Sequence, residues 1–321
     1  MSPSVFPGMS PKVPPYANAD PRHAPHGWRA VFRWAVWDRL LGRRRPAPPG
    51  PPAPRVPPDP KAIHEVNGPP RVTWIGHASF LGSWAGKAFL VDPVFSSRLG
   101  GFYPRYVPPG LGISDLPPLE VVMVSHSHYD HLDAATWRQL PPDVPCAVPL
   151  GLGRWFRRRG RTNVVELDWW QSAEFGPLRV TAVPARHWSR RTPWDTNHSW
   201  WCGFVVEADG TRIYHAGDSA WFDGFAEIGR RFPDIDAALL PIGAYEPGWF
   251  MEHNHLTPEQ AGEAFLATGA RMLIPMHWGT FQLTDEPLSE PIERLHRWWN
   301  ERQPEGRELR VLAVGETGIL S

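Results

Sequence analysis

The stretch VSHSHYDHLD at 124–133 constrains this chain more than any other, because it places three histidines and two aspartates within ten residues. This stretch begins at the end of the apolar run EVVMV, which predicts a buried strand. Alternate residues of an extended segment point the same way, so His126 and His128 can bind one metal ion. Asp130 and His131 follow where the chain tightens and can face a second ion. This spacing favours half of a metal site over a solvated, histidine-rich loop.

Other candidate ligands follow other predicted strands. The runs LRVTAV, TRIYH and RMLIP are each followed by a loop, and these loops carry His187, Asp218 and His277. The run DAALLPI leads into a loop that carries His253 and His255. A lone histidine after a strand is usually structural, but several such loops converging on one sheet edge indicate a shared site. Imidazole and carboxylate donors suit Zn²⁺, and iron or manganese can use the same set.

From residue 71 onward, short β runs are separated by Gly/Pro turns and interspersed helices. Helices are expected after Asp133, near 222–231, at 258–268 and at 289–301. Mixed strands and helices in one continuous block predict a layered α/β domain. The strongest strand candidates are RVTWI, KAFLV, EVVMV, LRVTAV, GFVVE, TRIYH, DAALLPI and RMLIP.

The helix at 258–268 has the clearest end signals. Thr257 can cap its N-terminus, Pro258 takes the first helical position, and Gln260 completes a capping box. Gly269 can end the helix.

Residues 1–70 differ in composition from the remainder. Two proline-rich stretches flank WRAVFRWAVWDRLLGRRR at 28–45, and prolines of this kind favour extended conformations without a packed core. We therefore expect residues 1–70 to form a proline-rich arm with a short Trp/Arg-rich helix. Residues 71–321 then form the catalytic domain.

The helix expected at 28–45 has a broad apolar stripe, since Trp34, Trp37 and Leu41 fall on a different face from Phe32. Tryptophan and arginine suit a membrane surface, so one interpretation is peripheral membrane contact through 28–45. The other is an arm packed on the main domain or on a partner subunit. The sequence does not fix the oligomeric state.

Charge and cysteine content narrow the remaining classes. Thirty-three basic and 33 acidic residues give a formal net charge of zero, which argues against a nucleic-acid binder. Cys146 and Cys202 form no CxxC pattern, and we expect buried free thiols in a reducing cytosol. No apolar run approaches about 18 residues, and the N-terminus lacks a secretory signal. We therefore expect a cytoplasmic protein that binds no nucleic acid.

The motif SHSHYDHLD, followed at long intervals by His187, Asp218 and His277, resembles the metallo-β-lactamase superfamily of dinuclear metal hydrolases. This resemblance implies a four-layer αββα sandwich with both metals at one edge of two sheets. The branch it most resembles is the N-acylphosphatidylethanolamine-hydrolysing phospholipase D and its bacterial relatives. The blocks that carry this second resemblance are WIGHASFL, DPVFSSR, RYVPPG, ELDWW, PARHWSRR, IGAYEP and HWGTFQLTDEPL.

The resemblance implies two Zn²⁺ ions and a role for each matching residue. The first metal is held by His126, His128 and His187. The second is held by Asp130, His131 and His277, with Asp218 bridging the two ions. All seven family positions are occupied in this sequence.

Two metals that share a water lower its pKa and produce a hydroxide nucleophile near neutral pH. The resemblance implies phosphodiester cleavage of the phospholipase D type on N-acylphosphatidylethanolamine-like phospholipids, with Asp130 and Asp218 in the catalytic set. His255 lies where that branch places a histidine that contacts the substrate, and His253 is a nearby decoy. The alternatives are a lactonase or another phosphoesterase on the same scaffold, or a non-catalytic metal-binding interaction protein.

Several conspicuous residues receive structural interpretations. We expect His77 near the site in a supporting role, Asp92 as a buried turn residue or hydrogen-bond acceptor, and Asp133 as a helix N-cap. The loop WSRRTPWDTNHSWW is either an aromatic, cationic rim of the site or an ordered surface loop.

Overall fold

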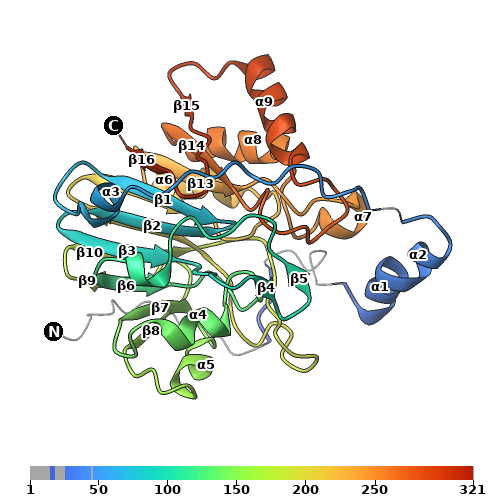
Figure 1. The fold of residues 1–321 in the computed structure, drawn as a ribbon, viewed down its shortest axis with the longest axis horizontal. Coiled ribbons are helices and arrows are strands. Elements are labelled where there is room, and N and C mark those ends of the chain that lie inside the picture. Colours follow the sequence, from blue (N-terminus) through green and yellow to red (C-terminus); the bar gives the residue numbers. More distant parts are fainter. Residues whose placement is uncertain (1–14, 19–25, 45, 321) are drawn as a thin grey trace.

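Two β-sheets pack face to face, and helices cover their outer faces (Figure 1). The computed structural model describes residues 15–18, 26–44 and 46–320. The first sheet has the order β16-β1-β2-β3-β6-β7-β8, with β1 Arg71–Gly76, β2 Ser79–Trp84, β3 Lys87–Val91, β6 Leu119–Met123, β7 Cys146–Pro149, β8 Val164–Leu167 and β16 Thr317–Ile319. The second has the order β15-β14-β13-β12-β11-β10-β9, with β9 Ser172–Phe175, β10 Leu178–Val183, β11 Gly203–Ala208, β12 Thr211–His215, β13 Ala237–Pro241, β14 Met272–Met276 and β15 Glu308–Leu309.

The helices fall into three groups along the described chain. Besides the two large sheets, β4 (Arg98–Leu99) and β5 (Tyr103–Pro104) form a short two-stranded antiparallel sheet. The N-terminal group is α1 Trp28–Phe32, a π-helical segment Arg33–Trp37 and α2 Asp38–Leu40. The first sheet carries α3 Pro60–His64, a 3₁₀ turn Ile113–Asp115, α4 Ala134–Gln139 and α5 Gly153–Arg157. The second carries α6 Gly224–Arg231, α7 Gly248–Met251, α8 Pro258–Thr268 and α9 Glu290–Arg302.

Alternation along the strands divides the apolar side chains between two cores. In β3, Phe89 and Val91 join the core between the sheets, whereas Leu90 faces the outer core. In that outer core Leu90 meets Trp137 of α4 and Phe156 of α5. On the other side α8 contacts β13, and α6 and α9 pack against α8. These four layers confirm the αββα sandwich expected from the sequence.

The predicted elements of the sandwich are confirmed in kind and, within a residue or two, in extent. Every strand candidate named from the sequence is a strand, and the four helices expected after residue 133 are α4, α6, α8 and α9. The Thr257 side chain accepts from the amide of Gln260, whose own side chain accepts from the amide of Thr257. Asp133 caps α4, and Gly269 ends α8 in the left-handed conformation with φ of 68°.

The N-terminal helix is shorter than expected. It ends at Leu40 rather than continuing to residue 45, because Gly42 adopts a φ of 65° and the amides of Arg43 and Arg44 bond back to the carbonyl of Asp38. Beyond it, residues 46–58 run extended along the sandwich, where Ala53 is buried and bonds to Gly279. Most of the first proline-rich stretch lies outside the described residues, and the domain boundary at residue 70 stays a prediction.

Parallel pairing sets the position of the site. In the first sheet β3 and β6 are parallel, and in the second β12, β13 and β14 are parallel. The loops that leave β6, β12 and β14 bring their donor side chains together, so the carboxyl ends of these strands lie at one edge of the sandwich. In the part of the chain that the structure describes, no helix combines the length and apolar character needed to cross a membrane.

Candidate metal centre

The predicted donors meet at this edge of the sandwich. The loop after β6 supplies the four residues of the opening motif, from His126 to His131. The loops after β10, β12 and β14 supply His187, Asp218 and His277. All seven predicted ligands are therefore brought together, although the first, His126, and the last, His277, are 151 residues apart in the sequence (277 − 126).

A first group consists of His126, His128, His187 and Asp218, whose donor atoms all lie within 4.8 Å of one another. Nδ1 of His128 is 2.9 Å from Nε2 of His126 and 3.1 Å from Nε2 of His187. The carboxylate Oδ2 of Asp218 lies 3.7 Å from Nε2 of His187. Nitrogen ligands about 2 Å from one tetrahedral ion would be separated by similar distances.

A second group lies directly beside the first and consists of Asp130, His131, His277 and His77. Asp218 reaches this group as well, since its Oδ2 is 3.1 Å from Nε2 of His131 and its Oδ1 is 3.2 Å from Nε2 of His277. Oδ2 of Asp130 is 3.3 Å from the same His277 nitrogen. One carboxylate therefore stands between two clusters of imidazole donors.

The inner atoms of these groups fit a metal ion and are poorly satisfied without one. Nε2 of His131, Nε2 of His277 and Oδ1 of Asp218 are buried and have no hydrogen-bond partner among the described residues. Buried polar atoms are normally paired, so a cluster of unpaired nitrogen and oxygen donors indicates a ligand. The donor set of imidazoles and carboxylates is one that Zn²⁺, iron or manganese accepts.

The outer nitrogens of the same histidines are fixed by other groups. Nδ1 of His131 donates to Oδ2 of Asp92 at 2.7 Å, and Nδ1 of His187 donates to the carbonyl of Asn254 at 2.8 Å. Oγ of Ser125 lies 3.0 Å from Nδ1 of His126. Such contacts hold the imidazole in the tautomer that turns its bare Nε2 inward, as metal ligands require. Asp92 thus takes the acceptor position expected of it.

Electrostatics within the centre are strongly coupled. Burial alone would lower the pKa of His277, but the carboxylates of Asp218 and Asp130 raise it to about 9. Burial would raise the pKa of Asp218, but the cationic forms of His131 and His277 hold it well below its usual range. Burial lowers the pKa of His128 to about 4. The Asp218 carboxylate is therefore ionised, and it favours the cationic forms of His131 and His277 beside it.

His77, expected to support the site, lies in direct contact with two of the proposed ligands. Its Nε2 is 3.0 Å from Oδ2 of Asp130, and its ring centroid is 3.9 Å from that of His277. Burial, followed by the charge of His277, lowers the pKa of His77 to about 3, so its imidazole is neutral. It hydrogen-bonds the carboxylate that the second group contains.

His255 and His253 are separated clearly by the structure. His255 forms a further donor group with Asp218 and His277, and its ring centroid is 5.1 Å from that of His187. Burial lowers the pKa of His255 to about 4, so this imidazole is neutral at pH 7. His253 instead lies 3.6 Å from the exposed carboxylate of Glu252. Only His255 faces the centre.

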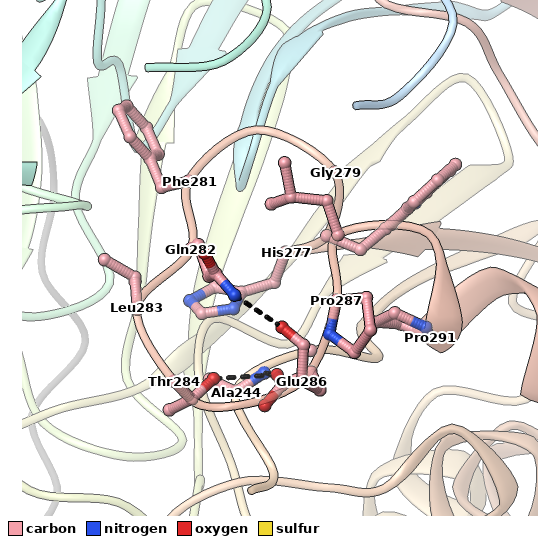
Figure 2. A pocket seen from close by; sticks show the side chains of 13 residues that line it. Ala244, His277, Gly279, Phe281, Gln282, Leu283, Thr284, Glu286, Pro287 and Pro291 are labelled. Carbon is pink, nitrogen blue, oxygen red and sulfur yellow. Dashed lines mark hydrogen bonds between the residues drawn. The ribbon is translucent and has the colours of Figure 1, made fainter. Parts of the chain in front are cut away.

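The loop that carries His277 also contains a buried acid, Glu286, to which the sequence analysis assigned no role. Figure 2 shows this loop curling round a small pocket. The hydroxyl of Thr284 donates a hydrogen bond to the carboxylate of Glu286, and the side-chain amide of Gln282 donates to the backbone carbonyl of Glu286. The carboxylate of Glu286 also accepts the amides of Ala244 and Glu246. This buried acid therefore ties the loop after β14 to the loop after β13.

A cavity of about 670 Å³ opens above the donors. His128, Asp130, Asp218 and His255 line one part of it. Its remaining lining is largely apolar, with Leu99, Phe102, Trp188, Phe250, Met251 and Leu283 among the contributors. Arg190 and Arg191 of the loop 188–201 also line it, as expected for a cationic, aromatic rim, whereas the tryptophans at the end of that loop are buried.

Comparison with known proteins agrees with this geometry. A sequence model of the beta-lactamase superfamily domain matches residues 87–278. The N-acyl-phosphatidylethanolamine-hydrolyzing phospholipase D 1 of Caenorhabditis elegans is 37% identical over 249 residues, which cover 72% of this chain and 70% of that protein. The mitochondrial N-acyl-phosphatidylethanolamine-hydrolyzing phospholipase D of Saccharomyces cerevisiae is 34% identical over 253 residues, or 74% of this chain and 54% of that protein.

A solved structure shows the same fold at lower identity. Igni18, a metallo hydrolase from the archaeon Ignicoccus hospitalis, superposes with a TM-score of 0.61 at 22% identity and covers 79% of this chain and 99% of its own. The family match extends over more than half of the 321 residues, and both phospholipase D relatives exceed 30% identity. Fold, donor geometry and relatives agree, and the chain belongs to the metallo-β-lactamase superfamily as a metal-dependent hydrolase.

Proposed function

We propose that the protein is a dinuclear zinc phosphodiesterase of the phospholipase D type that acts on N-acylphosphatidylethanolamine-like phospholipids. The observation that carries the proposal is the pair of adjacent donor groups, both approached by the Asp218 carboxylate, at the base of a largely apolar cavity. Two relatives more than 30% identical are named as hydrolases of this lipid class. An apolar wall beside a polar, metal-binding base suits an amphiphile.

The proposed ligand set follows the two groups. His126, His128 and His187 would hold the first zinc ion. Asp130, His131 and His277 would hold the second, and the Asp218 carboxylate, which approaches donors of both groups, would bridge the two. The inward-facing Nε2 atoms of His126, His131 and His187 support this assignment, because their Nδ1 atoms already have partners.

When bound, a zinc pair supplies a water of lowered pKa and neutralises charge on a phosphoryl group. The carboxylate of Asp218 lies between the two donor groups and would offset the repulsion between the ions. Asp130 accepts from His77 and is thereby held in the orientation that the second ion requires. The protein thus fixes the positions of the Asp218 and Asp130 carboxylates before substrate arrives.

His255 is proposed to contact the phosphate or the leaving oxygen. It lies at the wall of the cavity, and its imidazole is neutral because burial lowers its pKa to about 4. Nδ1 of His255 is buried without a hydrogen-bond partner among the described residues, so it is available to a substrate atom. Arg190, whose guanidinium lies over the ring of Trp188 at the cavity wall, adds positive charge that suits a phosphodiester.

We further propose a cytoplasmic location with peripheral contact to a lipid surface through residues 28–45. Phe32, Trp37 and Leu40 of the N-terminal helix are exposed by 50%, 51% and 76%, and Phe102 at the cavity mouth by 84%. Large apolar side chains exposed beside basic residues are typical of interfacial helices. Zero net charge gives no support to a nucleic-acid partner, and an oligomer remains compatible with all of these features.

The experiment that tests the function is a mass-spectrometric turnover screen of the zinc-loaded protein. Its substrates are N-acylphosphatidylethanolamines, small phosphodiesters and lactones. Release of phosphatidic acid and N-acylethanolamine is the expected result. Hydrolysis of lactones alone would replace the proposal with a lactonase, and turnover of small diesters without the lipid would indicate another phosphoesterase. Tight zinc binding without any turnover would indicate a binding protein.

A further inference from the structure

The N-terminal helix forms part of the wall of the cavity above the metal centre. Val31 and Trp34 of this helix, together with His26, line the same cavity as Asp218 and His255. We propose that this wall binds the acyl chain of the substrate and that Trp34 is a specificity-determining residue. The inference rests on the proposed phospholipase function for the identity of the chain that is bound.

Trp34 is held firmly at this wall. Its ring stacks on that of Phe250, with centroids 4.9 Å apart and planes 11° from parallel. The guanidinium of Arg44 lies 3.9 Å from the same ring centroid. Arg44 is in turn fixed by two bonds from Nε and Nη2 to Oδ1 of Asp285, at 2.9 and 2.6 Å. A rigid aromatic face therefore borders the cavity.

Phe250 links this wall to the metal centre. The ring of His26 also stacks on Phe250, with centroids 4.5 Å apart. Phe250 belongs to α7, and only four residues separate it from His255, which faces the donor groups. The aromatic wall and the proposed phosphate contact thus belong to one short segment, so a chain on the wall would leave its headgroup near the metals.

Two polar atoms of the wall match the chemistry of an acyl group. Nε1 of Trp34 and Nε2 of His26 are buried and have no hydrogen-bond partner among the described residues. A buried polar atom without a partner is unfavourable, so these two favour a ligand that carries polar atoms beside apolar ones. An amide- or ester-linked alkyl chain has this combination, since its carbonyl lies directly next to the methylene chain.

The same helix provides a matched control. Trp37 lies three residues after Trp34 but is 51% exposed and is not among the residues that line the cavity. The two side chains are chemically identical and differ only in the side of the helix that they occupy. Comparing the two alanine variants therefore distinguishes the effect of removing an indole from the cavity wall from the effect of removing any indole from this helix.

The test measures binding of butyl, octyl and dodecyl phosphate to the zinc-loaded full chain, below their micellar concentrations. In the wild type, affinity should rise by up to about fourfold per methylene that becomes buried. In Trp34→Ala, affinity for dodecyl phosphate should fall about tenfold or more relative to butyl phosphate. Trp37→Ala should retain the wild-type dependence on chain length, because its side chain does not line the cavity and monomeric alkyl phosphates present no lipid surface to it.

Equal losses for butyl and dodecyl phosphate in Trp34→Ala, or an unchanged dependence on chain length, would overturn the inference. If Trp34→Ala fails to fold, Arg44→Gln provides the second variant. It removes the guanidinium from the Trp34 ring and should reduce the dependence on chain length, whereas Arg44→Lys should restore it in part. Because these monoesters report binding alone, a protein that shows the chain-length effect but does not hydrolyse phosphodiesters would refute only the proposed function.

Discussion

Nδ1 of His131 lies 2.7 Å from Oδ2 of Asp92, and both side chains are completely buried. The same carboxylate accepts the amide and hydroxyl of Ser125, so it is fixed by the strand exit that carries the metal motif. Asp92→Ala should release the His131 ring and weaken zinc binding about 10- to 100-fold. Titration of zinc against a competing chelator measures this affinity.

A matched control for Asp92 is Asp143→Ala, which removes an exposed carboxylate in the turn before β7, outside the motif loop. It should bind zinc as the wild type does. Wild-type zinc affinity in Asp92→Ala would show that His131 needs no orienting partner and would remove Asp92 from the site.

Asp218 is the residue whose charge the proposed centre most requires. Its Oδ2 lies 3.1 Å from Nε2 of His131 and 3.7 Å from Nε2 of His187, so this one carboxylate approaches both donor groups. Asp218→Asn keeps the shape but removes the negative charge between two cations. Turnover should fall about a thousandfold or more, and His128→Ala should abolish it, while circular dichroism remains that of the wild type.

Asp209→Asn is the control for Asp218, because it makes the same change at an exposed turn with a φ of 48° that asparagine tolerates. Its turnover should match that of the wild type. Retained turnover in Asp218→Asn would contradict the bridging assignment.

Hydrophobic periodicity and helix end signals predicted the individual strands and helices of a layered α/β domain, whereas the four-layer αββα order was implied by the resemblance to the superfamily. RVTWI and KAFLV alternate between two cores, and Thr257 to Gly269 carries complete end signals. The strand β2 between those two runs was missed, since it contains Gly82. The structure explains this glycine, because a Cβ at position 82 would overlap the ring of Phe89 on the neighbouring strand.

Other features depend on contacts that local sequence does not encode. The sequence placed Trp34 and Trp37 on one helical face, but the structure buries part of Trp34 and exposes Trp37. The π-helical segment Arg33–Trp37 lies between them and shifts the phase of the side chains, so a regular helical wheel misassigns the faces. Glu286 was missed because its partners, the amides of Ala244 and Glu246, lie about 40 residues away.

His255 and His253 provide a direct test of the proposed phosphate contact. His255→Ala should reduce kcat about 10²- to 10⁴-fold while both zinc ions remain bound, because it removes the imidazole proposed to contact the phosphate or the leaving oxygen but removes no proposed ligand. His253→Ala should retain wild-type kcat, since His253 lies beside exposed Glu252. Turnover number and metal content, measured on the same samples, separate catalysis from metal loss. Equal activity of the two variants would remove His255 from the reaction.

Removal of the metal should produce a specific dependence of stability on pH. In the metal-free protein the Asp218 carboxylate raises the pKa of His277 from 6.5 to about 9, despite the opposing effect of burial. A raised pKa stabilises the fold below pH 6.5, and this stabilisation is lost as the pH rises through about 9. The Tm of the chelator-treated protein should therefore decline between pH 6.5 and 9, whereas His277→Gln should show less decline. A flat Tm in the chelated wild type would contradict the ion pair.

Glu286 should stabilise the loops around the centre through hydrogen bonds that glutamine cannot reproduce. Oε1 accepts the amide of Ala244 at 2.6 Å and the hydroxyl of Thr284 at 2.7 Å, and Oε2 accepts the amide of Glu246 at 3.1 Å. In Glu286→Gln the side-chain amide would face at least one of these donors, at a cost of about 1–3 kcal/mol. A decrease of several degrees in Tm is expected, with a smaller decrease in Thr284→Val, which leaves both backbone amides bonded. If Glu286→Gln melts at the wild-type temperature, the carboxylate contributes no more than an amide would, and the two loops are held by packing instead.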